Sequence, residues 1–107
     1  MAVKGGPHPN AISVEGLDFL SNSHEVARLW VEDQGPATCI IQPDRLEDPE
    51  MFGMLMVDTI RHAGRAFASY LNISEAKALN RIWSGLDAER DESTTPLNTI
   101  QDYEKPN

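Results

Sequence analysis

The sequence predicts an α+β fold, in which a small antiparallel sheet, formed by a β-hairpin, is covered by two C-terminal helices. Three observations support this prediction. Residues 24–42 contain two short apolar runs on either side of a turn-forming segment, the pattern of a β-hairpin. Runs with helical periodicity follow Asp48 and Ser74. Because the strands precede the helices and do not alternate with them, both helices are expected on one face of the sheet.

The composition of the two chain ends predicts no regular secondary structure there. Residues 1–10 are rich in glycine and proline, which predicts a flexible N-terminus. Residues 91–107 are polar and contain two prolines, which predicts a disordered acidic tail. Residues 11–90 are expected to form a single α+β domain, since a chain of 107 residues can bury one modest core.

The first ordered segment allows two interpretations. With a period of two, residues 26–31 alternate between the faces of a strand, and the DQGP segment turns into a second strand at residues 38–42. With a helical period, Val26, Leu29 and Trp30 form an apolar stripe instead. The adjacent tryptophan and valine, together with the turn residues, favour the hairpin.

The hairpin is expected to need a further strand. Pro43 ends the second strand because it lacks the backbone donor that a sheet requires. A sheet of two strands is only marginally stable by itself. A third strand, supplied either by the N-terminal segment or by a second copy of the chain, would stabilise the sheet, and the sequence leaves it open.

The first helix is expected to run from Pro49 to about Leu71. Asp48 supplies a capping carboxylate, and Pro49 occupies the first helical position, where its missing N–H is harmless. On a helical wheel, one side forms an apolar stripe that is expected to face the core. Its members are Phe52, Leu55, Met56, Thr59, Ala63, Ala66 and Tyr70.

A second row on this helix, four residues apart, predicts a close contact. Ile60, Gly64 and Ala68 form the row, and two of the three are small. Glycine within a helix costs about 1 kcal/mol relative to alanine. Gly64 therefore indicates that another element packs close to the helix backbone, either the second helix or a second copy of the chain. The helix is expected to contact two surfaces.

The second helix is expected to begin after Ser74, whose hydroxyl can cap it, and to end near residues 87–92. The junction between the helices partly matches a DNA-binding helix-turn-helix, with Asn72 at the turn position that commonly holds glycine. The match fails in the second helix, whose charged residues from Glu75 to Arg90 sum to zero and whose apolar residues fall one position late. These apolar residues are Leu79, Ile82, Trp83 and Leu86.

Charge and composition restrict the partners. The net charge of −8 repels phosphate backbones and anionic lipid, so we expect no nucleic-acid partner and no membrane partner. No apolar run is long enough to span a bilayer, and no signal peptide is recognisable, which predicts a cytoplasmic protein. The single cysteine, Cys39, lies in an apolar run and is expected to be a buried small side chain.

One stretch of the first helix interleaves ionisable and apolar residues. Asp58 and His62 are four residues apart, a spacing at which an aspartate can fix a histidine tautomer, as in general bases and around metal ions. Catalysis also needs a nucleophile, an oxyanion donor or a metal, and no third group is identifiable by spacing. The sequence therefore predicts no catalytic, cofactor or metal site. If the protein were an enzyme, the candidates for catalytic residues would be Asp58, Arg61 and His62.

The segment VARLWV, followed after a turn and a strand by DPEMFGMLMVDTIRHAGRAFA, carries a family resemblance. Across residues 25–89 the chain resembles a family of small, largely alphaproteobacterial proteins known as a domain of unknown function. The most specific positions are Asp48, Pro49, Gly53, Asp58, Arg61 and His62. Where such proteins tend to carry a glycine pair and a histidine across the hairpin turn, this chain has QGPAT at residues 34–38. The resemblance implies the same order of elements and brings no assigned activity.

The sequence predicts a non-catalytic, homodimeric protein that acts through protein–protein contacts. A methionine- and phenylalanine-rich patch at the start of the first helix and the small-residue row indicate the contact surfaces. The expected interaction residues are Met51, Phe52, Met54, Ile60, Gly64 and Ala68. The alternative is a small-molecule or metal-dependent enzyme that uses Asp58 and His62.

Overall fold

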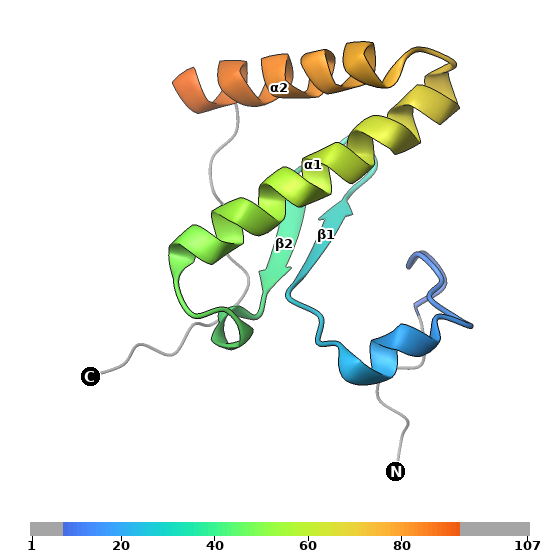
Figure 1. Cartoon of the computed structure of the whole chain (residues 1–107), viewed down its shortest axis with the longest axis vertical. Helices are drawn as coiled ribbons and strands as arrows, with labels where there is room; N and C mark the ends of the chain where they lie inside the picture. The colour runs from blue at the N-terminus through green and yellow to red at the C-terminus, as the bar shows by residue number, and fades with distance from the viewer. Residues whose placement is uncertain (1–7, 93–107) are drawn as a thin grey trace.

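The computed structural model describes residues 8–92 and contains a β-hairpin followed by two helices (Figure 1). The predicted α+β class is therefore confirmed. The strands are β1 (Ala27–Val31) and β2 (Ala37–Ile41), and the helices are α1 (Pro49–Leu71) and α2 (Glu75–Asp91). Short 3-10 helices precede the hairpin at Asp18–Asn22 and follow it at Pro43–Arg45. Most of the predicted flexible N-terminus and acidic tail lies outside the described residues.

The hairpin is antiparallel, and its register places Ala27 opposite Ile41 and Val31 opposite Ala37. Gln34 adopts the left-handed backbone conformation in the turn, with φ of 57°. The strand interpretation of residues 26–31 is therefore correct, and the helical alternative is wrong.

The sheet has two strands within residues 8–92. The second strand begins one residue earlier than expected, at Ala37. The segment before the hairpin forms the 3-10 helix Asp18–Asn22 and adds no third strand. Of the two possible sources of a third strand, the segment before the hairpin therefore supplies none within residues 8–92.

The helix ends follow the local signals in the sequence. The carboxylate of Asp48 accepts a hydrogen bond of 2.9 Å from the Met51 amide, and Pro49 opens α1. Asn72 closes α1 in the left-handed conformation, with φ of 57°. The hydroxyl of Ser74 then accepts a hydrogen bond of 3.1 Å from the Lys77 amide at the start of α2. The first helix is continuous over the predicted range.

Removing either cap is expected to weaken the fold. Asp48→Ala and Ser74→Ala each leave helix amides without a side-chain acceptor, which typically lowers the free energy of unfolding by about 1 kcal/mol. Chemical denaturation at a fixed protein concentration measures the change. Ser69→Ala, at an exposed position in the last turn of α1, is the matched control and is expected to change the stability by less than about 0.5 kcal/mol. Equal stability of all three variants would contradict the capping assignment.

The two helices pack against each other at the small-residue row. A Cβ atom added to Gly64 would lie 2.7 Å from Cγ and Cδ2 of Leu79, so glycine is what allows this leucine to approach the α1 backbone. Ala68 and Ala78 are buried in the same contact region, with exposed fractions of 9% and 3%. Of the two elements that the sequence left open for this row, α2 is the one that occupies it.

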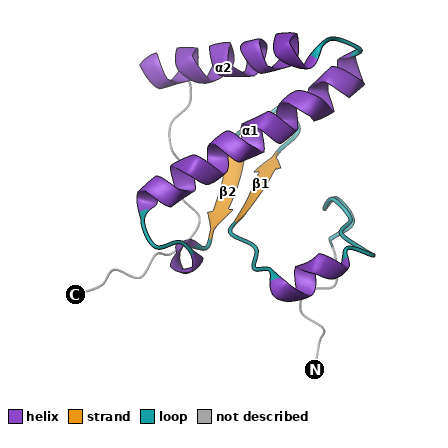
Figure 2. Ribbon diagram, viewed as in Figure 1, coloured by secondary structure: helices purple, strands orange, loops and turns teal. Residues whose placement is uncertain are grey.

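The helical pair and the hairpin are less closely joined. Close backbone approaches within residues 8–92 link the two strands to each other and the two helices to each other, and none links a helix to a strand. In the view of Figure 2, α1 passes across the hairpin, and α2 lies beyond α1. Any contact between the hairpin and the pair of helices is therefore made by side chains alone.

Burial differs from the predicted core stripe. Phe52, Leu55, Met56 and Ala63 are half-buried, whereas three other members of the stripe are exposed. The exposed members are Thr59, Ala66 and Tyr70. The most deeply buried positions of α1 belong to the neighbouring small-residue row, because the helix turns that row towards α2.

Cys39 also differs from expectation. Its side chain is exposed, because β2 alternates and directs this residue to the open face of the hairpin. The prediction of a buried cysteine was wrong for this reason: the apolar run was taken as a sign of burial. Within residues 8–92, none of the helices combines the length and the apolar character that crossing a membrane requires.

Candidate functional site

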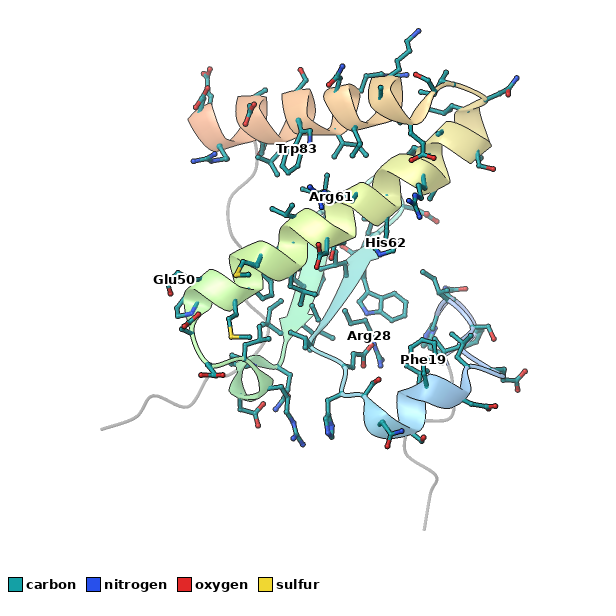
Figure 3. The ribbon with its side chains drawn as sticks, in the orientation of Figure 1. Phe19, Arg28, Glu50, Arg61, His62 and Trp83 are labelled. Carbon is teal, nitrogen blue, oxygen red and sulfur yellow. The ribbon has the colours of Figure 1, made fainter. Side chains whose placement is uncertain are left out.

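The polar side of α1 carries the catalytic candidates of the sequence. Asp58, Arg61 and His62 are all exposed. In Figure 3, Arg61 and His62 point away from each other, with Arg61 on the side of α1 that faces Trp83 of α2. Within residues 8–92 no hydrogen bond joins Asp58 to His62, despite their spacing. The structure therefore places the three residues on one helix without bringing them to a common point.

A metal site needs several ligands that converge. In the part of the chain that the structure describes, no group of three or more histidine, cysteine, aspartate or glutamate side chains lies close enough to hold a metal ion. Asp58 lies four residues before His62 on the same helix, and a pair of this kind lacks the third protein ligand that zinc and iron sites use.

A shallow hollow of about 220 Å³ lies at the junction of the two helices. Its lining is apolar apart from one guanidinium, that of Arg81. The lining residues are Phe67, Leu71, Ile73, Ala78, Arg81 and Ile82. A single cation in an apolar, open hollow has no acid–base partner, so this hollow offers a contact surface and not a catalytic pair. None of the catalytic candidates lines it.

A second hollow, of about 250 Å³, follows one edge of the hairpin. Its charged residues are Glu25 and Arg28, which form an exposed ion pair with a distance of 3.0 Å between Nε and Oε2. The hydrogen bonds from the guanidinium to the Glu25 carboxylate, followed by the attraction of opposite charges, raise the pKa of Arg28. Because each group satisfies the other, the pair leaves no free acid or base in this hollow.

The expected interaction residues divide into two groups. Gly64 and Ala68 are buried beneath α2, and Ile60 is half-buried beside them. The methionine-rich patch remains open: Met51 is 38% and Met54 is 68% exposed, with Phe52 half-buried between them. The first group holds the two helices together, and only the second group is free for contact with another molecule.

Sequence reasoning missed the open face of the hairpin. Leu29 and Val31 of β1 are 64% and 77% exposed, although strands rich in such residues usually turn them inward. The alternation of residues 26–31 identified the two faces of the strand. No signal in the sequence could show which face is left uncovered, since covering depends on elements distant in the chain.

Comparison with known proteins identifies the family. The family model described as "Domain of unknown function (DUF5076)" matches residues 18–94, so the chain belongs to this family. A solved structure from the photosynthetic bacterium Rhodopseudomonas palustrus CGA009, named there a "putative pyruvate dehydrogenase", is 31% identical. The match covers 94% of this chain and 100% of that chain, with a TM-score of 0.64. No curated protein matches the chain significantly. The resemblance stated from the sequence is thereby confirmed.

Proposed function

We propose that this member of the family is a non-catalytic protein that acts through protein–protein contacts and self-associates as a homodimer. The observation that carries the proposal is the lack of a packed interior. Within residues 8–92, no large side chain is fully buried, and the buried apolar side chains are those of two alanines. A second molecule that covers the exposed apolar side chains would supply the missing interior.

The exposed apolar surface is extensive. Fully burying one large apolar side chain contributes about 1.5–3 kcal/mol, so leaving many of them in water forgoes much of the stability of a small domain. Large exposed apolar patches on a folded chain mark contact surfaces. The exposed large apolar residues are Ile12, Val14, Leu17, Phe19, Leu20, Leu29, Val31, Ile40, Met51, Met54, Val57, Phe67, Tyr70 and Leu71.

The enzyme alternative receives less support from the geometry. Asp58 and His62 are exposed, share no hydrogen bond within residues 8–92 and line neither hollow. The name carried by the R. palustrus structure describes that protein. In the described part of this chain, the candidate residues form no acid–base pair that would support an enzymatic activity. Self-association is therefore the better supported function.

Light scattering coupled to size-exclusion chromatography tests the proposal. We expect a mass close to twice the chain mass of 11.9 kDa, falling towards that mass only on strong dilution. A mass of one chain at every concentration would remove the proposal. Turnover of pyruvate by the purified protein, lost in His62→Gln, would support the enzyme alternative instead.

A further inference from the structure

One face of the hairpin carries no charge. The register pairs Leu29 with Cys39 and Val31 with Ala37, and paired residues lie on the same side of a sheet. We call these four residues the hairpin face. All four are exposed, with fractions of 64% for Leu29 and 77% for Val31. These four residues combine apolar side chains with exposure to water, whereas Ala27 and Ile41, paired at the other end of the same face, are half-buried.

The opposite face of the hairpin has a different character. Trp30 and Thr38 are half-buried there, and Arg28 forms its ion pair with Glu25. The ring of Trp30 also contacts His8 in an edge-to-face arrangement, with 5.6 Å between the ring centroids. The two faces thus differ in charge, and the most exposed large strand residues, Leu29 and Val31, lie on the hairpin face, ahead of Ile40 at 42% on the opposite face.

A second exposed apolar segment precedes the hairpin. We call residues 11–22 the N-terminal arm; it stands apart from the helices in Figure 1 and includes the 3-10 helix Asp18–Asn22. Ile12 is 91% and Phe19 is 63% exposed. Within residues 8–92 no close backbone approach links the 3-10 helix of the arm to a strand or to α1 or α2. Several apolar side chains of the arm therefore keep large exposed fractions within the described residues.

We infer that a second copy of the chain covers both surfaces, the N-terminal arm of each copy lying against the hairpin face of the other. This inference rests on the self-association proposed above and names its interface. A two-fold axis makes the exchange reciprocal, so each dimer contains the contact between arm and hairpin face twice.

The size of the surface agrees with a stable dimer. The seven large apolar residues of the arm and the hairpin face are between 38% and 91% exposed, a surface of the same order as the roughly 800 Å² that each partner contributes to a standard interface. They are Ile12, Val14, Leu17, Phe19, Leu20, Leu29 and Val31. The hairpin face alone would be too small for a specific contact, and the arm supplies the remainder.

Charge favours this pairing over a contact with α1. The only charged residues of the arm are acidic, Glu15 and Asp18. The apolar patch at the start of α1 is flanked by Glu50 and Asp58, so an arm placed there would meet like charges. The hairpin face has no charged residue, and an acidic arm can lie on it without that repulsion. A chain with a net charge of −8 needs such a neutral surface to associate with itself.

Cys39 provides the test, because it is the single cysteine of the chain and lies within the hairpin face. We expect its reaction with a maleimide to slow about tenfold once about nine-tenths of the chains are dimeric, since only the monomer exposes the thiol. In Val31→Glu, a buried carboxylate would oppose the contact. This variant is expected to scatter light as a monomer and to react rapidly at every concentration.

Two further variants test the contribution of the arm separately from that of the hairpin face. Phe19→Glu changes the arm without altering the sheet, and it is expected to dissociate the dimer even if Val31→Glu fails to fold by circular dichroism. Ala66→Glu is the matched control: Ala66 is exposed on α1 and belongs neither to the arm nor to the hairpin face. It is expected to leave both the dimer mass and the protection of Cys39 unchanged.

The outcomes distinguish this inference from the proposed function. A dimer that persists in Val31→Glu and Phe19→Glu, with Cys39 reacting rapidly throughout, would overturn the inference and leave self-association intact. Protection of Cys39 that does not depend on concentration would mean that the same chain covers the face, and it would also overturn the inference. A monomer at every concentration would overturn both proposals.

Discussion

Replacing Gly64 with valine is expected to lower the free energy of unfolding by about 2–3 kcal/mol. A Cβ atom at this position would lie 2.7 Å from Cγ and Cδ2 of Leu79, well inside van der Waals contact. Overfilling a packed contact typically costs 1–3 kcal/mol, because side chains and backbones must move apart. The two methyl groups of valine add to the clash and separate α1 from α2, the main close helix contact of the described chain. Chemical denaturation at fixed protein concentration measures the loss.

Gly53 provides the matched control in the same helix. A Cβ atom there would meet nothing within 4 Å, so Gly53→Ala is expected to raise the free energy of unfolding by about 1 kcal/mol through helix propensity alone. Gly64→Ala combines the same gain with the clash and is expected to be destabilising on balance. The clash term should shrink when Leu79 is also replaced by alanine, which a double-mutant cycle measures. Equal effects of alanine at positions 53 and 64 would contradict the packing described for Gly64.

Local chemistry explains why the element ends were predictable. Asp48 and Pro49 start a helix through groups that lie within one turn of each other, and Ser74 does so for the second helix. Asn72 closes α1 because its side chain tolerates the left-handed conformation. These signals depend on neighbours in the sequence and need no knowledge of the tertiary structure.

Gly64 was informative for a different reason. A glycine in the middle of a long helix carries a local cost, so its presence pointed to a close contact before any partner was identified. The partner, Leu79 of α2, lies fifteen positions further along, and only the packing of the two helices reveals it. The sequence supplied the position of the contact and left its occupant open.

Burial was less predictable, because periodicity shows which residues share a face but not whether another element reaches that face. Tyr70 lies on the apolar stripe of α1 and is nevertheless 82% exposed. Cys39 alternates with its neighbours as a strand residue should, yet its side of the hairpin is open. Both discrepancies arise where the described residues provide no covering element, and such cover depends on parts of the chain distant in sequence.

The candidate site also shows the difference between what local spacing predicts and what tertiary packing decides. Asp58 and His62 were placed on one helix side by spacing alone, and the structure leaves both exposed. The hollow at the helix junction could not be predicted, since Phe67 and Ile82 come from different helices and meet only after packing. The spacing of residues within one element could be predicted, whereas convergence between elements could not.

Replacing Ala78 with aspartate is expected to be the most damaging single change, lowering the free energy of unfolding by about 3 kcal/mol or more. Ala78 is 3% exposed and lines the apolar hollow with Phe67 and Leu71, so a carboxylate there would be buried with no partner among these side chains. Ala76→Asp introduces the same residue two positions earlier, where the side chain is exposed and the positive end of the helix dipole favours an acid. That control is expected to be neutral or stabilising by up to about 1 kcal/mol. The two variants share their charge and nearly their helix propensity, so they differ mainly in the burial of the new carboxylate. Denaturation midpoints of the two variants, compared at one protein concentration, isolate the burial at position 78, and equal midpoints would contradict the helix contact assigned to it.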